Sequence, residues 1–297
     1  MTAGDNLVEA LATQLLISPQ AIEEAIRRGL LSFVQHRNSH CWRFGDSRNG
    51  SFRRLDGAPF RIKGQYAKAE AETHGEAWHQ LIGLDDVVEH DRREILLTPE
   101  GSKDALAAFH FADAEDTLRK IGVLAALGSA VKPTPEDIEK LRGRRIRIFP
   151  DVDPSGQNAA ARIGQPIATL AAEVQIFDFV GLHRDDGEPV KDLFDLTRID
   201  YDDFEVNRGL WSITDLDSKW ERVKTIPAPI YFSDFSNTIP SKQEFLLSPP
   251  SPPHVSPESH GFPVYPVSNS QELEKELEEL AKRDACTERD TARERRW

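Results

Sequence analysis

Acidic residues recur in the middle of the chain at points where an apolar run ends. Glu100 follows one such run, and Asp104 lies one helical turn further along, so its side chain can return toward the same point. Asp151 and Asp153 follow a second run. Carboxylates crowded together repel one another, and a divalent cation relieves that repulsion. Mg²⁺ is usually held by a few carboxylates together with water and substrate phosphates. The pattern therefore predicts a Mg²⁺ site that engages phosphate.

A third acidic segment, 190–196, follows another apolar run and contains Asp192 and Asp195. Lys191 stands beside Asp192, where its ammonium group could either neutralise a phosphate or face solvent. A single local turn does not explain carboxylates that follow three different predicted strands. We therefore expect this segment to join the same site.

Taken singly, each acidic segment also has a structural explanation. Glu100 and Asp104 could complement the dipole at a helix N-terminus. The run 151–156 could be a turn with a helix N-cap, and Lys191 with Asp192 could be a surface pair. Because all three segments follow strands of one α/β unit, we favour a shared site over three coincidences.

The residues that position these acids alternate between strand and helix patterns over 91–205. We expect strands at 94–97, 121–127, 145–149 and 174–179 and helices at 102–112, 135–141 and 155–172. Strands that alternate with helices imply a parallel sheet with right-handed crossovers. Ligands of such α/β sheets lie at the carboxyl ends of the strands, where the acids are placed.

At this point the sequence resembles a known family. Glu100-Gly101 with Asp104, followed by Asp151-Val152-Asp153 with Gly156, is similar to the signature of TOPRIM domains. These domains occur in bacterial primases, topoisomerases, OLD-type nucleases and recombination-repair proteins. The resemblance covers residues 93 to about 200, and it implies a Rossmann-like parallel sheet flanked by helices.

Two further segments resemble the primase branch of that family. Residues 187–196 (Gly-Glu-Pro-Val-Lys-Asp-Leu-Phe-Asp-Leu) are similar to its late acidic segment. More loosely, residues 41–60 resemble the lead-in of small primase-like TOPRIM proteins of bacteria and mobile elements. The resemblance implies nucleotidyl transfer in DNA replication. Its Mg²⁺ ions, for which Mn²⁺ can substitute, would bind nucleotide phosphates and activate a primer 3′-hydroxyl, or in a nuclease a water molecule.

The resemblance also implies roles for individual residues. Glu100 corresponds to a general acid or base that can join the metal site, and Asp151 and Asp153 correspond to Mg²⁺ ligands. Asp104 and Asp192 would support the site. The predicted catalytic residues are Glu100, Asp104 and Lys191, and the predicted metal ligands are Glu100, Asp151, Asp153 and Asp192.

The first 90 residues predict a small, locally basic α+β domain. Leucines at helical spacing, then Ser18-Pro19 as a helix start, indicate two short helices, and Asn49-Gly50 and Asp56-Gly57 punctuate an antiparallel sheet. Ten Lys and Arg residues between Arg27 and Lys68 outnumber four nearby acids. Basic residues interleaved with aromatic ones suit phosphate contacts and base stacking, or form a solvated sheet face. The candidate nucleic-acid-binding residues are Arg43, Arg48, Arg53, Arg54 and Lys63.

The composition excludes several classes of protein. Thirty-seven Lys and Arg residues against 50 Asp and Glu give a net charge of −13, which excludes a basic coat over the whole protein. Two cysteines cannot form a zinc ribbon, so we expect no zinc. No Gly-rich loop ends in Gly-Lys-Ser/Thr, so the chain has no helicase motor. No apolar run approaches the length of a membrane span, and we expect a cytoplasmic protein without a membrane partner.

The remaining sequence predicts a tail. Residues 206–224 would be a short extension, residues 225–268 a disordered Pro/Ser-rich linker, and residues 269–297 a charged helix.

The first hypothesis is a primase-like protein that binds single-stranded DNA or a primer–template and acts with a separately encoded replicative helicase. The alternatives are a Mg²⁺-dependent nuclease of the OLD or repair type and a non-catalytic DNA-binding or scaffold module of a mobile element.

Overall fold

The computed structural model describes residues 3–73, 80–128, 130–199, 212–217 and 223–227. Its contacts divide the chain into two units, residues 1–234 and 235–297, and every described residue belongs to the first. The expected helix at 269–297, and the expected linker beyond residue 227, lie outside the described residues. No helix in the described ranges is long and apolar enough to cross a membrane.

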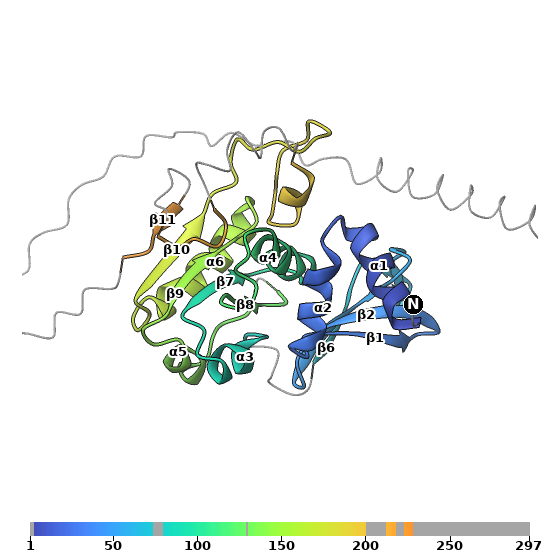
Figure 1. The fold of residues 1–297 in the computed structure, drawn as a ribbon, viewed down its shortest axis with the longest axis horizontal. Helices are drawn as coiled ribbons and strands as arrows, with labels where there is room; N and C mark the ends of the chain where they lie inside the picture. The colour runs from blue at the N-terminus through green and yellow to red at the C-terminus, as the bar shows by residue number, and fades with distance from the viewer. Residues whose placement is uncertain (1–2, 74–79, 129, 200–211, 218–222, 228–297) are drawn as a thin grey trace, which may run out of the picture. The chain divides into compact units, whose positions relative to one another are not determined.

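A five-stranded sheet forms the centre of the first unit (Figure 1). Its strands are β7 (Glu94–Thr98), β8 (Gly122–Ala125), β9 (Arg145–Ile148), β10 (Glu173–Phe177) and β11 (Val223–Thr225). They lie in the order β11-β10-β9-β7-β8, with β7 to β10 mutually parallel and β11 antiparallel to β10. The predicted alternation of four parallel strands with helices is confirmed, whereas β11 was not predicted.

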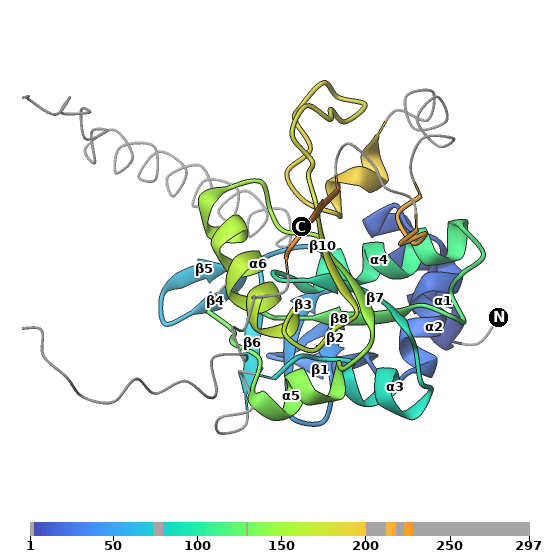
Figure 2. The same cartoon turned by 90° about the vertical axis from the view of Figure 1, so that its left-hand side faces the viewer.

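Helices cover both faces of this sheet (Figure 2). They are α3 (Leu84–Glu89), α4 (Ser102–Ala114), α5 (Pro135–Lys140) and α6 (Pro154–Ile167). The strands are apolar on both faces: Leu96 packs in the cluster that contains α4, and Ile95 and Leu97 pack in the cluster that contains α3 and α6. The first crossover helix, α4, thus lies on the opposite face from the later ones, so the connections change face between β7 and β9.

The N-terminal part is a second, smaller layer of helices and antiparallel strands. The helices are α1 (Ala3–Leu15) and α2 (Pro19–Arg27); the strands are β1 (Leu31–His36), β2 (Ser39–Gly45), β3 (Asn49–Arg54) and β6 (Glu70–Thr73), with the hairpin β4 (Phe60–Ile62) and β5 (Gln65–Ala67). The predicted helix start is confirmed, because Ser18 Oγ accepts from the backbone N–H of Ala21 at 3.3 Å with Pro19 first in the helix. The Asn49-Gly50 pair is not the predicted turn: both residues begin β3, and Asp46 closes the turn by accepting from the Arg48 and Asn49 N–H groups.

The N-terminal layer is joined to the parallel sheet through α2 and α4. Buried Ala21 and Ile22 of α2 belong to the same hydrophobic cluster as Leu106 of α4. Beside them the buried Arg28 side chain pairs with Glu24 at 2.8 Å and with Asp86 at 3.1 Å. A shared apolar core and a buried ion pair hold the two layers together within this unit.

Residues 212–217 are tied to the sheet by one buried arginine. Arg147 on β9 is fully buried, and its Nε donates to Gln175 Oε1 at 2.9 Å. Its two Nη atoms donate to the carbonyls of Ser212, Ile213 and Asp215 at 2.8–2.9 Å. The guanidinium therefore provides hydrogen-bond donors to the backbone carbonyls of residues 212–217, which belong to no helix or strand.

Candidate metal and phosphate site

The predicted acids lie near the topological switch point of the parallel sheet, where the strand order reverses. In sequence order the strands β7 to β10 lie 2-1-3-4, and the reversal falls between β7 and β9. The loops after these two strands diverge to opposite faces, which leaves a crevice at their carboxyl ends. Glu100 and Asp104 follow β7, and Asp151 and Asp153 follow β9.

Gly101 lets the chain turn from β7 into α4 and lets the Asp104 side chain lie against its backbone. Its φ of +93° is rarely adopted by L-residues, and a Cβ there would lie 2.7 Å from Asp104 Oδ2. Asp104 itself is 7% exposed, and its Oδ1 accepts from the Phe194 N–H at 3.0 Å. The first turn of α4 is therefore bonded directly to the loop that carries Asp192.

The loop after β9 is held against the same segment. The Val152 N–H donates to the Lys191 carbonyl at 2.8 Å, which places Asp151 beside Asp192. A Cβ on Gly156 would lie 2.5 Å from the carbonyl oxygen of Asp151, so only glycine permits this approach of helix and loop. Backbone contacts thus bring the three acidic segments together.

The charges of these acids act on one another. Burial, followed by the charges of Asp192 and Glu100, raises the pKa of Asp151 to about 7. Burial and the neighbouring Asp192 raise the pKa of Asp104 well above its ordinary value. Burial and Asp153 raise the pKa of Glu100, and burial also raises that of Asp192. Such mutual repulsion shows that the carboxylates share one environment.

The donor set fits a divalent cation. Glu100 Oε1 is buried without a hydrogen-bond partner, and no donor or cation in the described residues contacts the Asp151 side chain. The described ranges contain no group of three or more Asp, Glu, His or Cys side chains close enough together to enclose a metal ion. Mg²⁺ commonly uses one or two carboxylates with water and substrate phosphates. The unpartnered oxygens of Glu100 and Asp151 are suited to that mode of binding.

Three predicted or neighbouring residues also have structural roles. Asp153 caps α6, because its Oδ1 accepts from the Gly156 N–H at 2.8 Å, and its side chain remains exposed. Asp195 shapes the third loop, accepting from the Lys191 N–H at 3.1 Å and pairing with Arg184 at 3.2 Å. Lys191 is exposed, and its backbone joins the loops.

Three of the arginines predicted to bind nucleic acid are paired with acids. Arg43 pairs with Glu72, Arg48 with Asp46 and Arg54 with Asp56. The basic excess counted from the sequence ended at Lys68, just before the two glutamates of β6, which pairs with β3. Lys63 is exposed in the β4–β5 turn.

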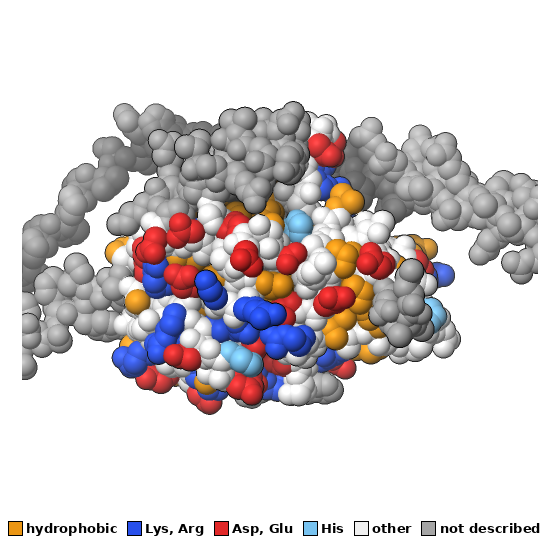
Figure 3. Space-filling model, viewed as in Figure 1, with side chains coloured by type: hydrophobic (Ala, Val, Ile, Leu, Met, Phe, Trp, Pro, Cys, Tyr) orange, Lys and Arg blue, Asp and Glu red, His pale blue; other side chains and the backbone are white. Residues whose placement is uncertain are grey.

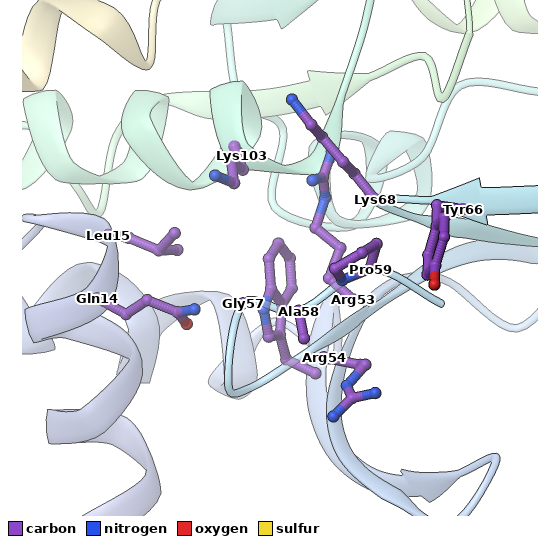
Figure 4. A pocket seen from close by; sticks show the side chains of 11 residues that line it. Gln14, Leu15, Arg53, Arg54, Gly57, Ala58, Pro59, Tyr66, Lys68 and Lys103 are labelled. Atoms are coloured by element: carbon purple, nitrogen blue, oxygen red, sulfur yellow. The ribbon is translucent and has the colours of Figure 1, made fainter. Parts of the chain in front are cut away.

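Arg53, the fourth of these arginines, turns toward the acidic site. Its Nε donates to the Ser102 hydroxyl on α4 at 3.1 Å, and its guanidinium lies 5.9 Å from the Trp42 ring centroid. It lines a cavity of about 410 Å³. Figure 4 shows Lys103, Lys68 and Arg53 around one end of this cavity, whereas Arg54 points away from Lys103. Lys68 ends the basic stretch counted from the sequence but was not chosen as a candidate, and Lys103 lies outside that stretch.

Charge on the outer surface is mixed (Figure 3). On the face shown, Lys and Arg side chains gather over the half of the unit that holds the parallel sheet, and Asp and Glu side chains lie among them. The cavity near the carboxylates, by contrast, is lined by Lys and Arg side chains and by no acidic residue.

Comparisons with known proteins found structural similarity. No family model and no curated protein matches the sequence. A DNA primase domain from Pseudomonas aeruginosa aligns at 18% identity and a TM-score of 0.39, over 68% of this chain and 59% of that one. The DnaG catalytic core aligns at 16% identity and a TM-score of 0.41, over 68% of this chain and 72% of that one. The zinc-binding and RNA polymerase domains of the Aquifex aeolicus primase align at 16% identity and a TM-score of 0.37, over 67% and 48%.

Proposed function

We propose that this chain is a primase-like TOPRIM protein that binds DNA and Mg²⁺ and acts on phosphodiesters in primer synthesis or its support. One observation carries the proposal. Carboxylates from three separate segments meet at the carboxyl ends of β7 and β9, and backbone bonds from Phe194 and Val152 hold the segments together. A crowded, partly desolvated acidic site at this position suits metal-bound phosphate.

One or two carboxylates among Glu100, Asp151 and Asp192 would hold the metal together with water and substrate phosphates, and the exposed Asp153 could contribute its second oxygen. A bound divalent cation supplies Lewis-acid polarisation of a phosphoryl oxygen and lowers the pKa of an attacking hydroxyl. Burial and the charge of Asp153 raise the pKa of Glu100, which is the direction that favours a role as general acid or base. Asp104 faces the Asp192 loop and positions it through the Phe194 N–H.

The DNA would approach from the side of the small sheet. Arg53 projects from β3 to α4, and it is the one of the predicted basic residues that reaches the first helical turn after Glu100. Lys191 is exposed beside Asp192 and is available to a phosphate. Cooperation with a separately encoded helicase, and single-stranded DNA or a primer–template as substrate, remain parts of this proposal.

A gel assay tests the proposal. The protein is incubated with end-labelled, primed single-stranded DNA, nucleotides and Mg²⁺. Extension of the primer supports the primase-like function, because the carboxylates then promote attack by the 3′-hydroxyl. We expect Asp151→Asn and Glu100→Gln each to reduce extension at least a hundredfold, in the range found for acid–base and metal-site groups. Asp116→Asn, at an exposed residue just beyond the opposite end of α4 from Asp104, should leave extension unchanged.

Two outcomes would contradict the proposal. Metal-dependent shortening of the labelled strand, lost in Asp151→Asn, would show that the same carboxylates serve a nuclease. DNA binding without extension or shortening, equal in all variants, would show a non-catalytic module. Each result would also separate the alternatives that the sequence left open.

A further inference from the structure

A second cavity lies at the opposite end of the parallel sheet from the carboxylates. Its volume is about 600 Å³, and its lining comes mainly from residues at which β7, β8 and β9 begin. Because β7 is five residues long and each strand residue adds about 3.3 Å, the cavity is roughly 15 Å from the end of β7 that leads to Glu100. The cavity is therefore separate from the metal site.

Neighbouring strands bring cations to this cavity in a row. β8, β7 and β9 are consecutive in the sheet, and each begins beside a basic residue that lines the cavity. Strands of one sheet lie about 4.8 Å apart, so the row extends over roughly 10 Å. The cations of the lining are Arg119 and Lys120 before β8, Arg92 and Arg93 before β7, and Arg145 at the start of β9.

Two of these cations have no neutralising partner. The two acids that line the cavity are each paired with one of its arginines, at 2.8 and 3.1 Å. Arg92 is buried, pairs with Asp86 at 2.8 Å and donates to the Arg119 carbonyl, which fixes the loop before β8. Within the described residues, the exposed side chains of Arg119 and Lys120 form no ion pair or hydrogen bond. They are available to an external anion, and the backbone that carries them is held in place.

The lining suits a phosphate backbone better than a protein surface. Ala172 is the one apolar side chain among the described residues that line the cavity, whereas protein interfaces are centred on aromatic and apolar anchors. Gly143 has no atom within 4 Å of the place where a Cβ would lie, so the cavity is open to close approach there. A nucleic-acid strand carries a charge about every 3.4 Å of helix axis, and a row of cations across neighbouring strands can follow such a chain.

We propose that this row is a second nucleic-acid contact, at which Arg119 and Lys120 bind backbone phosphates of a DNA strand without reading its sequence. Contacts to phosphates position a strand and carry no base information. A strand bound there would stay tethered to the protein while its reacting end lies at the carboxylates. The choice of DNA as the occupant rests on the proposed function, whereas the anion site does not.

The salt dependence of DNA binding tests this contact. Binding of a fluorescein-labelled oligothymidylate, long enough to span the unit, is measured by polarisation in EDTA over a range of salt concentrations. We expect Arg119→Gln and Lys120→Gln each to lower the slope of log affinity against log salt by about 0.7, because each removes one phosphate contact. Lys224→Gln removes an exposed lysine charge on β11, at the other edge of the sheet, and should leave the slope unchanged. A strand of mixed sequence should respond in the same way.

An unchanged slope in both variants would overturn the inference. Polyglutamate tests an acidic protein as the occupant: if Arg119→Gln and Lys120→Gln weaken polyglutamate binding and leave DNA binding unaltered, the site does not serve DNA. Because EDTA removes catalysis, the outcome is independent of the proposed function. A lowered slope in a protein that neither extends nor cleaves DNA would reject that function and retain the contact, and an unchanged slope with normal extension would do the reverse.

Discussion

Asp151 shows how the site is built at the scale of single residues. It has no donor or cation of its own in the described residues, and acids from three segments surround it. The surroundings of Asp151 therefore disfavour its ionised form. Such perturbed carboxyl groups are common at functional sites. The sequence could indicate Glu100 and Asp151 because each follows closely after the end of a buried strand, β7 or β9.

The crowding of Asp151 predicts a pH-dependent effect on stability. Its pKa of about 7 in the folded chain lies above the ordinary value of 3.8. Between these values the folded state keeps a proton that the unfolded state has lost, so stability falls as the pH rises from about 4 to about 7 and stays low above that. In EDTA, Asp151→Asn should raise the melting temperature at pH 8 by about 2–4 °C, and by less at pH 5. Equal melting of this variant and Asp116→Asn at pH 8 would contradict the repulsion.

Gly101 gives a second prediction at this scale. In Gly101→Ala the new Cβ meets Asp104 Oδ2 and the backbone keeps a φ of +93°, so the variant should lose about 2 kcal/mol of stability. Gly143→Ala is the control, because its φ is +68° but no atom lies within 4 Å of its Cβ. Urea unfolding measures both variants. If the two losses are the same, the close approach of Asp104 costs nothing.

The basic residues show where single-residue prediction fails. Arg43 and Arg48 were predicted to bind nucleic acid from charge and neighbouring aromatics, yet both are held by carboxylates in the fold. Lys68 and Lys103, which form no ion pair within the described residues, were not among the candidates. An arginine is neutralised when the neighbouring strand brings a carboxylate next to it, as β6 brings Glu72 to Arg43. A count of charges along the sequence does not show which strands are neighbours.

At the scale of elements, the sheet order determines which acids meet. The strands and crossover helices were predictable, because strands buried on both faces read as short apolar runs bounded by turn residues. The polar edge strands β6 and β11 were missed, since Glu70–Thr73 and Val223–Thr225 have no apolar pattern. The order β8-β7-β9-β10 comes from tertiary packing and places the loops after β7 and β9 together.

Arg147 supplies the test at this scale. Arg147→Met removes the donors to three backbone carbonyls of residues 212–217, and these acceptors then stay buried without partners. We expect a loss of about 3 kcal/mol in urea unfolding, since hydrogen bonds to charged groups are involved. Faster proteolysis near 212–217 should accompany it. The exposed Arg93→Met is the control, and an equal loss in both would show that Arg147 does not anchor the segment.

At the scale of the whole molecule, the described unit separates its charges. The face shown in Figure 3 carries mixed charge, whereas carboxylates gather at one side of the first turn of α4 and the Lys and Arg residues that line the cavity lie at the other. Together they suit a ligand that contains both a metal ion and phosphates. The acidic half of this arrangement followed from the sequence, and the basic half required the fold.

The most direct test of the account is the binding of Mn²⁺, followed by the loss of the free-ion signal in electron paramagnetic resonance. The wild type and Asp116→Asn should bind Mn²⁺ with the same affinity. Glu100→Gln and Asp151→Asn should each weaken binding at least tenfold, because each replaces a negatively charged oxygen ligand by a neutral amide. Equal binding by all four proteins, or no binding by any, would contradict the claim that these carboxylates form one metal site.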